Sequence, residues 1–136
     1  MEKIVVNSNP QNLVIDFDDV LYITTLRKRA LLIKSDGKEK RLNISLQKLY
    51  EKIESIGFIR CHKSFIVNID YIESFNKSIC TLKNGDAVPL GRKYYKEFKN
   101  VIYNQWSERV FINISMFDLW RNINQIERRL ECESGI

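Results

Sequence analysis

Basic side chains gather at three places in this sequence where the chain is expected to turn or to begin an element. Guanidinium groups suit bidentate recognition of guanine edges, and lysine ammonium groups suit phosphates. Loops on a rigid β scaffold often carry binding residues. We therefore take these side chains as candidate DNA-binding residues, with solvated turn charges as the alternative. The candidates are Lys28, Arg29, Arg60, His62, Lys63, Arg92 and Lys93, and the hydroxyl of Ser64, next to Lys63, is included with them.

The charge of the chain agrees with a polyanionic partner. The 136 residues include 22 Lys and Arg against 17 Asp and Glu, a formal net charge of +5. Residues 1–106 hold 18 of the bases and 12 of the acids, whereas residues 107–136 hold 4 bases and 5 acids. A basic body with a slightly acidic tail indicates either a polyanion partner or a solvated basic face.

Catalytic interpretations find little support. His62, Ser64 and Asp70 offer the residue types of a hydrolase triad, but no nucleophile elbow surrounds them, and a triad is defined by geometry. The five glycines are isolated, so no glycine-rich loop can cradle a phosphate. A receiver domain would need an acidic pocket and many more residues. We expect no enzyme, no cofactor and no small-molecule substrate.

Cysteine and histidine counts argue against a metal site. The chain has three cysteines, without a CxxC pair, and a single histidine, His62. A structural zinc site needs four such ligands at characteristic spacings. Cys80 is interpreted as a small buried hydrophobe. For Cys61, between Arg60 and His62, a lowered thiol pKa and redox sensing form the minor alternative.

Length and composition favour one globular domain with an appendage. Hydrophobic residues make up 44% and aromatic residues 11%, enough apolar surface to disfavour disorder. Apolar stretches are far too short to span a bilayer, and the sequence turns polar at Asn7 without a signal peptide. We expect a cytoplasmic protein.

The first half of the chain is predicted to be mainly β. Strands are expected at residues 4–7, 12–17 and 20–25, followed by an apolar run at 30–33. Asp36-Gly37 predicts a hairpin turn, with residues 40–44 as the returning strand. Ser45 then caps a helix whose apolar residues recur at spacings of 3 and 4 until Gly57.

The second half adds a hairpin and a helix to this pattern. Residues 58–72 show only mixed, short apolar pieces. Strands at 78–82 and 87–90 flank the turn Asn84-Gly85. After Gly91 a basic helix carries an apolar stripe, which we interpret as core packing.

A further strand and helix are expected in the tail. Residues 110–114 could form the strand, and Ser115 with Asp118 would cap the helix. Its apolar positions repeat at spacings of 3 and 4, as in a coiled coil. Trp120 widens the stripe, so docking on its own domain stays open as the alternative to self-association. The repeating positions are Met116, Leu119, Ile123, Ile126 and Leu130.

The run from Phe58 to Asn68, FIRCHKSFIVN, resembles the central signature of the LytTR DNA-binding domain, F-x-R-x-H-x-S-[FY]-[IL]-V-N. The surrounding segments resemble the family in order and spacing over about residues 4–104. These segments are Asp19–Ile23, Ser45–Leu49, Tyr71–Ser74, Leu82–Gly85 and Val88–Tyr95.

The resemblance implies a mainly β fold of small packed antiparallel sheets with short helices, to which the tail would add an extra C-terminal helix. It also implies a transcription regulator that inserts loops into successive major grooves of double-stranded DNA at paired direct repeats. We expect a homodimer, at least on DNA. The family's base-contacting positions fall on Arg29, Lys63 and Arg92. Arg29 stands where histidine occurs and Lys63 where asparagine or arginine is frequent, so base preference there is open. Arg60, His62 and Ser64 could instead support the loop, and for His62 we favour support.

The expected organisation is a LytTR domain at residues 1–106 and a C-terminal extension at 107–136 for dimerisation or docking. The segment that resembles the LytTR family begins only a few residues after Met1. We therefore expect a regulator that acts without a receiver domain, and a piece of a longer regulator is the alternative. Two other functions are alternatives. One is a protein-interaction module that pairs with a full-length regulator. The other, RNA binding, ranks last because the aromatic residues fall on core-periodic positions.

Overall fold

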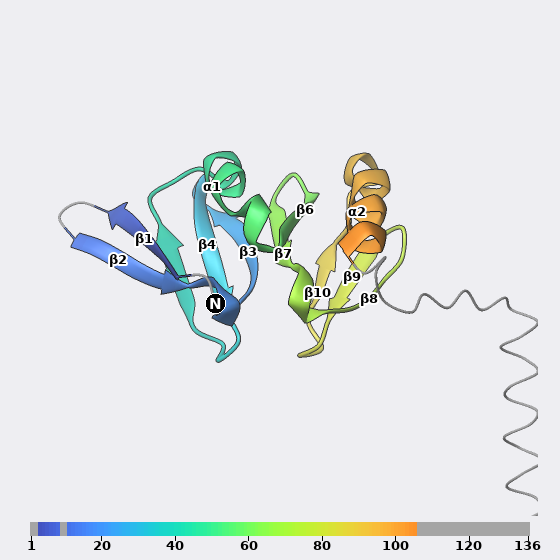
Figure 1. The fold of residues 1–136 in the computed structure, drawn as a ribbon, viewed down its shortest axis with the longest axis horizontal. Coiled ribbons are helices and arrows are strands. Elements are labelled where there is room, and N and C mark those ends of the chain that lie inside the picture. Colours follow the sequence, from blue (N-terminus) through green and yellow to red (C-terminus); the bar gives the residue numbers. More distant parts are fainter. Residues whose placement is uncertain (1–2, 9–10, 106–136) are drawn as a thin grey trace, which may run out of the picture. The chain divides into compact units, whose positions relative to one another are not determined.

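A five-stranded antiparallel sheet forms the centre of the computed structural model, which describes residues 3–8 and 11–105. Its strands run in the order β5-β4-β3-β7-β6. Figure 1 shows this sheet with a two-stranded hairpin on one side and a smaller sheet on the other. The five strands are β3 (Val20–Leu26), β4 (Arg29–Lys34), β5 (Glu39–Leu42), β6 (Phe58–His62) and β7 (Phe65–Asn68).

The N-terminal hairpin consists of β1 (Lys3–Ser8) and β2 (Gln11–Asp16), paired antiparallel. Its alternation places Ile4 and Ile15 against the main core, while Val5 and Val14 face outward. The expected strand 12–17 ends one residue early. The Asp16 side chain accepts a hydrogen bond from the Asp18 N–H at 3.0 Å, which starts a short 3-10 helix, η1 (Phe17–Asp19).

The third sheet has the order β10-β9-β8 and carries the long helix. Pro89 lies on the edge strand β10, where a missing N–H is tolerated. Phe98 of helix α2 (Arg92–Gln105) is fully buried, and its ring meets that of Phe75 edge-on with centroids 5.1 Å apart. The elements are η3 (Ile69–Tyr71), β8 (Ile72–Phe75), β9 (Ile79–Leu82), β10 (Ala87–Pro89) and α2 (Arg92–Gln105).

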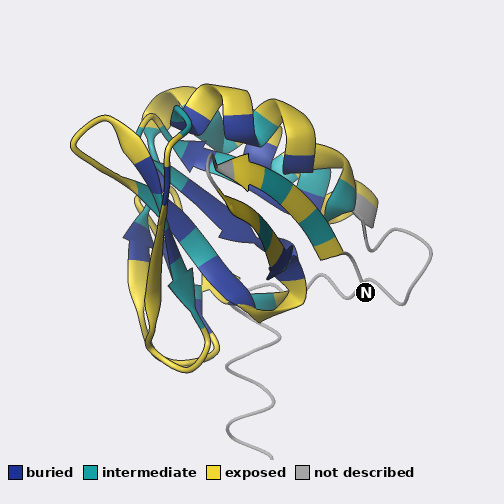
Figure 2. Cartoon of the chain, turned by 90° about the vertical axis from the view of Figure 1, so that its left-hand side faces the viewer, coloured by how far each residue is buried: buried dark blue, intermediate teal, exposed yellow. Residues whose placement is uncertain are grey.

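Helix α1 (Leu46–Ile53) covers one face of the central sheet and ends through the 3-10 turn η2 (Glu54–Ile56). Ser45 caps it by accepting a hydrogen bond from the Lys48 N–H at 3.3 Å, as predicted. Gly57 follows with φ of 104°, the left-handed conformation expected of it. Figure 2 shows that burial concentrates where helices and strands face one another, while the turns are exposed.

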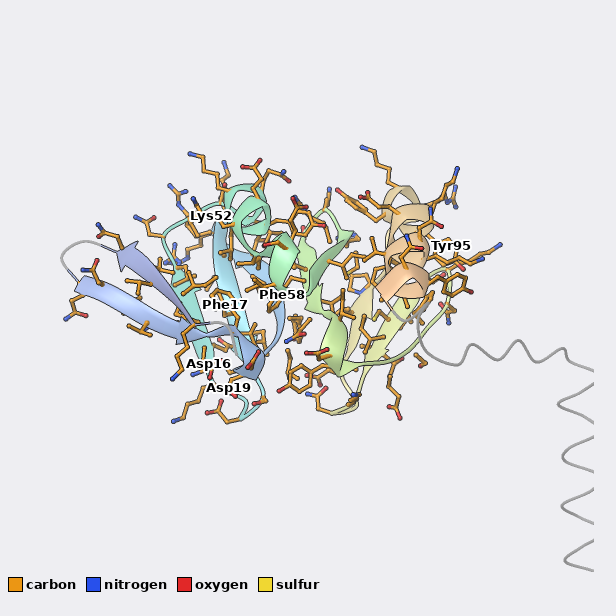
Figure 3. All side chains as sticks on the ribbon, viewed as in Figure 1. Asp16, Phe17, Asp19, Lys52, Phe58 and Tyr95 are labelled. Carbon is orange, nitrogen blue, oxygen red and sulfur yellow. The ribbon has the colours of Figure 1, made fainter. Side chains whose placement is uncertain are left out.

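The main core lies between α1, the hairpin β1–β2 and the central sheet. Phe17 and Phe58, labelled in Figure 3, meet edge-on there with ring centroids 5.6 Å apart. Asn68, at the end of the signature, is the one buried polar residue among those described. Its side-chain amide donates to the Val20 carbonyl at 2.9 Å, and its oxygen accepts from the Asp70 N–H at 3.1 Å. Asn68 therefore joins η3 to the start of β3.

Several boundaries predicted from the sequence are corrected by the structure. Residues 58–72, expected to be mixed, form the hairpin β6–β7, then η3 and the start of β8. Their period-2 pattern is hidden because both faces are partly buried, in the inner strand β7 and also in the edge strand β6, against which α1 packs. The strand expected at 40–44 ends at Leu42, because Ile44 turns back and donates its N–H to the Leu42 carbonyl.

The strand at 110–114 and the helix after Ser115 lie outside the described residues. Within residues 3–8 and 11–105, no helix is both long and apolar enough to cross a membrane.

Candidate nucleic-acid interface

The three basic places singled out in the sequence lie at one end of the central sheet. Strands β3 and β7 are antiparallel, with Ile23 opposite Ile66, so the turn after β3 and the turn before β7 share that end. The Thr24 hydroxyl donates to the Ser64 carbonyl at 3.0 Å and joins the two turns. The Gly91 N–H donates to the Cys61 carbonyl at 2.7 Å, which brings the start of α2 to the same place. Figure 1 shows both turns and this helix end along one edge.

We call this end the basic edge and define it as segments 24–30, 43–48, 60–65 and 90–96. The segment 43–48 belongs to it because the Ile44 carbonyl accepts the Ala30 N–H at 2.9 Å. The four segments contain no Asp or Glu. Their basic residues are Arg27, Lys28, Arg29, Lys48, Arg60, Lys63, Arg92, Lys93 and Lys96.

The Arg60 side chain holds the backbone of the β6–β7 turn through hydrogen bonds. Its Nε donates to the His62 carbonyl at 3.2 Å, and its two terminal nitrogens donate to the Lys63 carbonyl and to the Gln47 side chain on α1. The pairing of β6 with β7 is irregular at this point, between Arg60 and His62. A planar guanidinium can satisfy several carbonyls of a tight turn at once. Arg60 thus fixes the backbone on which Lys63 is displayed.

His62 supports the same turn through its ring. Its Nδ1 accepts a hydrogen bond from the Ser64 N–H at 3.1 Å, so the proton of the neutral imidazole belongs on Nε2. The ring is half-buried and packs edge-on against Phe65 at 5.7 Å. The His62 side chain is therefore placed by internal contacts.

A shallow hollow of about 320 Å³ lies where this turn meets helix α2. Gly91 forms the contact point, because a Cβ there would come within 3.2 Å of the Tyr94 ring and 3.4 Å of the His62 ring. The N-terminal end of a helix also favours negative charge. The lining residues are His62, Lys63, Gly91, Arg92, Lys93 and Tyr94.

Eight of the nine basic side chains at the edge are exposed, all except Arg60. Within the described part of the chain none of these eight side chains makes a hydrogen bond or an ion pair. They are Arg27, Lys28, Arg29, Lys48, Lys63, Arg92, Lys93 and Lys96. The opposite end of the sheets carries several acids in its turns, namely Asp18, Asp19, Asp36, Asp70 and Asp86. Exposed basic side chains of this kind can neutralise the phosphates of a nucleic-acid backbone.

The structure corrects the minor hypothesis about Cys61. Cys61 is fully buried, and burial raises the pKa of its thiol to about 12 despite the neighbouring Arg60. The charge of the flanking residues is outweighed because the side chain points inward from β6. Cys80 is also fully buried, as predicted, and burial raises its pKa to about 12.

Two residues of the edge were missed in the sequence. Arg27 forms the β3–β4 turn together with Lys28, but the pair lacks the Asn or Gly that marks such turns. Gln47 accepts a hydrogen bond from Arg60 across a separation of thirteen residues, and nothing in its local pattern distinguishes it from other exposed helix positions. All eight predicted residues lie at the basic edge, with Arg60 and His62 engaged in its internal contacts.

Comparison with known proteins defines the class. A family model, the LytTr DNA-binding domain, matches residues 11–103. The chain belongs to this family of DNA-binding domains. The LytTr DNA-binding domain of a methyl-accepting/DNA response regulator from Bacillus cereus has the same fold, with a TM-score of 0.61 over 75% of this chain and 97% of that one, at 22% identity.

Curated relatives are longer than this chain. The sensory transduction protein LytT of Enterococcus faecalis is 33% identical over 84 residues, which cover 58% of this chain and 35% of the relative. The transcriptional regulatory protein BtsR of Salmonella typhi is 27% identical over 94 residues, 65% of this chain and 38% of the relative. LytT of Bacillus subtilis is 26% identical over 106 residues, 74% and 44%. The matched region spans less than half of each relative.

Proposed function

We propose that this protein is a sequence-specific transcription regulator that binds double-stranded DNA through the basic edge. The observation that carries the proposal is the convergence of two turns and a helix start, whose segments contain no Asp or Glu, into one basic edge. The β6–β7 turn enters a major groove, with Lys63 and Arg92 as base contacts and Arg29 as a third from the β3–β4 hairpin. Lys28 and Lys93 contact phosphates, whereas Arg60, His62 and Ser64 hold the turn.

The proposed target is a pair of direct repeats bound by two copies of the chain. Two linked copies on paired sites gain affinity from a high effective concentration. The expectation that the protein acts without a receiver domain stays a prediction, as does the role of residues 107–136 in pairing.

Selection of duplexes from a genomic fragment library, followed by titration at several salt concentrations, tests this function. If the edge neutralises about 5–8 phosphates, the log–log slope of affinity against salt should be roughly −4 to −7. A slope near zero, or no binding to any duplex at low salt, would contradict the proposal. If the protein instead captures a full-length regulator and no DNA, the alternative of a protein-interaction module is correct.

A further inference from the structure

The β3–β4 turn holds two consecutive residues in the left-handed backbone region. Arg27 has a φ of 51° and Lys28 a φ of 65°. L-residues other than glycine are disfavoured there, and asparagine or aspartate are the usual exceptions. Both residues of this turn are long, basic and exposed.

Elsewhere in the described part of the chain, positive φ occurs only at glycines. The other positive-φ residues there are Gly37, Gly57 and Gly85. Gly37 and Gly85 belong to the turns Asp36-Gly37 and Asn84-Gly85, which join β4 to β5 and β9 to β10. The two non-glycine residues with positive φ therefore both lie in the β3–β4 turn, at the basic edge.

The pairing of β3 with β4 fixes the length of this turn. Leu26 pairs with Arg29 and Thr25 with Ala30, so only two residues remain to reverse the chain. Ala30 is fully buried, and its N–H is bonded to the Ile44 carbonyl at 2.9 Å. Positive φ at both central residues is the mark of a type I′ turn, which matches the twist of the strands and for which Asn-Gly is the favoured pair. Arg-Lys meets the same requirement with conformational strain.

We propose that Arg27 and Lys28 form a DNA-backbone clamp whose charges are retained at the expense of turn stability. This inference rests on the proposed function and adds Arg27 to it. The left-handed conformation makes the turn short and stiff, so both side chains project from the tip of the hairpin beside the β6–β7 turn. Their ligands are phosphates of the duplex that flank the groove read by Lys63 and Arg92.

The test compares three variants of the full chain by thermal unfolding and by duplex binding across salt concentrations. Arg27→Asn/Lys28→Gly keeps the turn shape and removes both charges. Arg27→Lys/Lys28→Arg keeps charge and strain. Lys38→Gln/Lys83→Gln removes two charges from exposed turns at the opposite end of the molecule.

The Asn-Gly variant should melt at a higher temperature than the parent, while its salt slope should become shallower by about 1.8 through the loss of two phosphate contacts. The Lys-Arg variant and the Lys38/Lys83 control should keep slopes close to the parent's. An unchanged slope in the Asn-Gly variant overturns the clamp, and so does an equal change in the control. A lower melting temperature overturns the strain argument.

A single substitution in the same turn keeps the proposal testable if the Asn-Gly variant fails to fold. Lys28→Asn removes one charge and suits the left-handed region, so its slope should change by about half as much. Failure of the parent to bind any duplex would instead contradict the proposed function, which separates the two hypotheses.

Discussion

Arg92 is the exposed guanidinium at the first residue of α2, beside the hollow that Lys63 and His62 also line. A bidentate contact to a guanine is worth about 1–3 kcal/mol of discrimination. Arg92→Ala should therefore weaken binding by that amount and relax preference at one base pair. Arg92→Lys keeps the charge without the planar fork, so it should lose most of the discrimination as well.

Competition between the preferred duplex and single-base variants measures this effect. The same comparison applies to Lys63→Ala and Arg29→Ala. Equal weakening on every sequence would identify these side chains as phosphate contacts and contradict base readout.

Arg60 acts through the turn that it holds, because its three donor groups are engaged by the His62 and Lys63 carbonyls and by Gln47. Arg60→Lys keeps the charge but cannot form the same set of bonds, so it should lose sequence preference at the position read by Lys63. In a double-mutant cycle, Arg60→Lys and Lys63→Ala should couple by about 0.5–3 kcal/mol. Additive effects would show that Arg60 contributes charge alone.

Two buried thiols link stability to alkaline pH. In the fold Cys61 and Cys80 stay protonated up to a pKa of about 12, against 9.0 for the ordinary thiol. Their contribution to stability is therefore complete below about pH 9 and is lost as the pH rises from about 9 to 12. Urea unfolding across this range should show decreasing stability, with a weaker decrease in Cys61→Ala/Cys80→Ala. An identical decrease in that variant would assign the effect to other groups, such as Tyr22 and Tyr50, whose pKa values burial also raises.

At the scale of elements, the contact between β6 and the start of α2 depends on the missing side chain of Gly91. Gly91→Val would push a branched side chain against the Tyr94 and His62 rings. Such overpacking typically costs about 1–3 kcal/mol. We expect lower thermal stability and, because His62 and Arg92 are both displaced, weaker duplex binding.

Gly57→Val is a matched comparison for this variant. It strains a backbone with φ of 104°, but a Cβ there meets no neighbour within 4 Å and the site lies away from the edge. It should lower stability without a specific loss of DNA affinity. Equal affinity losses in both variants, measured well below their melting temperatures, would contradict the role given to Gly91.

Elements with strong local signals were predictable from the sequence. Helix α1 carries its own start and stop in Ser45 and Gly57, and Asp36-Gly37 and Asn84-Gly85 mark two hairpins. The strands β6 and β7 could not be recognised from the alternation of apolar and polar residues, since their burial depends on contacts with β3 and with the third sheet. The β3–β4 turn was hidden because Arg27-Lys28 contradicts local preference, and only the paired strands impose its shape.

The candidate site was predictable as a set of residues, and its arrangement was not. Basic residue types near turns indicated which side chains to consider. The bond from Thr24 to Ser64 and the bond from Gly91 to Cys61 connect segments that are distant in the sequence. The engagement of Arg60 with three partners likewise depends on the tertiary fold. Composition alone therefore could not distinguish contact residues from supporting ones.

At the scale of the whole molecule, the apolar repeat from Met116 to Leu130 predicts self-association through a segment that lies outside the described residues. Two heptads are marginal as an isolated coiled coil, so pairing should depend on protein concentration. Sedimentation of the full chain should show dimers at tens of micromolar, and a chain that ends at Trp106 should be monomeric. A monomeric full chain, or no difference between the two, would contradict the dimer hypothesis.

The separation of charge between the two ends of the sheets has a kinetic consequence. With the unopposed bases at one end and the turn aspartates at the other, the domain carries an electric dipole roughly along its strands. In the field of a duplex this dipole rotates the molecule before contact, so that productive encounters exceed those of random orientation. Removing an edge charge should then mainly slow complex formation, whereas loosening the Arg60 turn should mainly shorten the lifetime of the complex once formed.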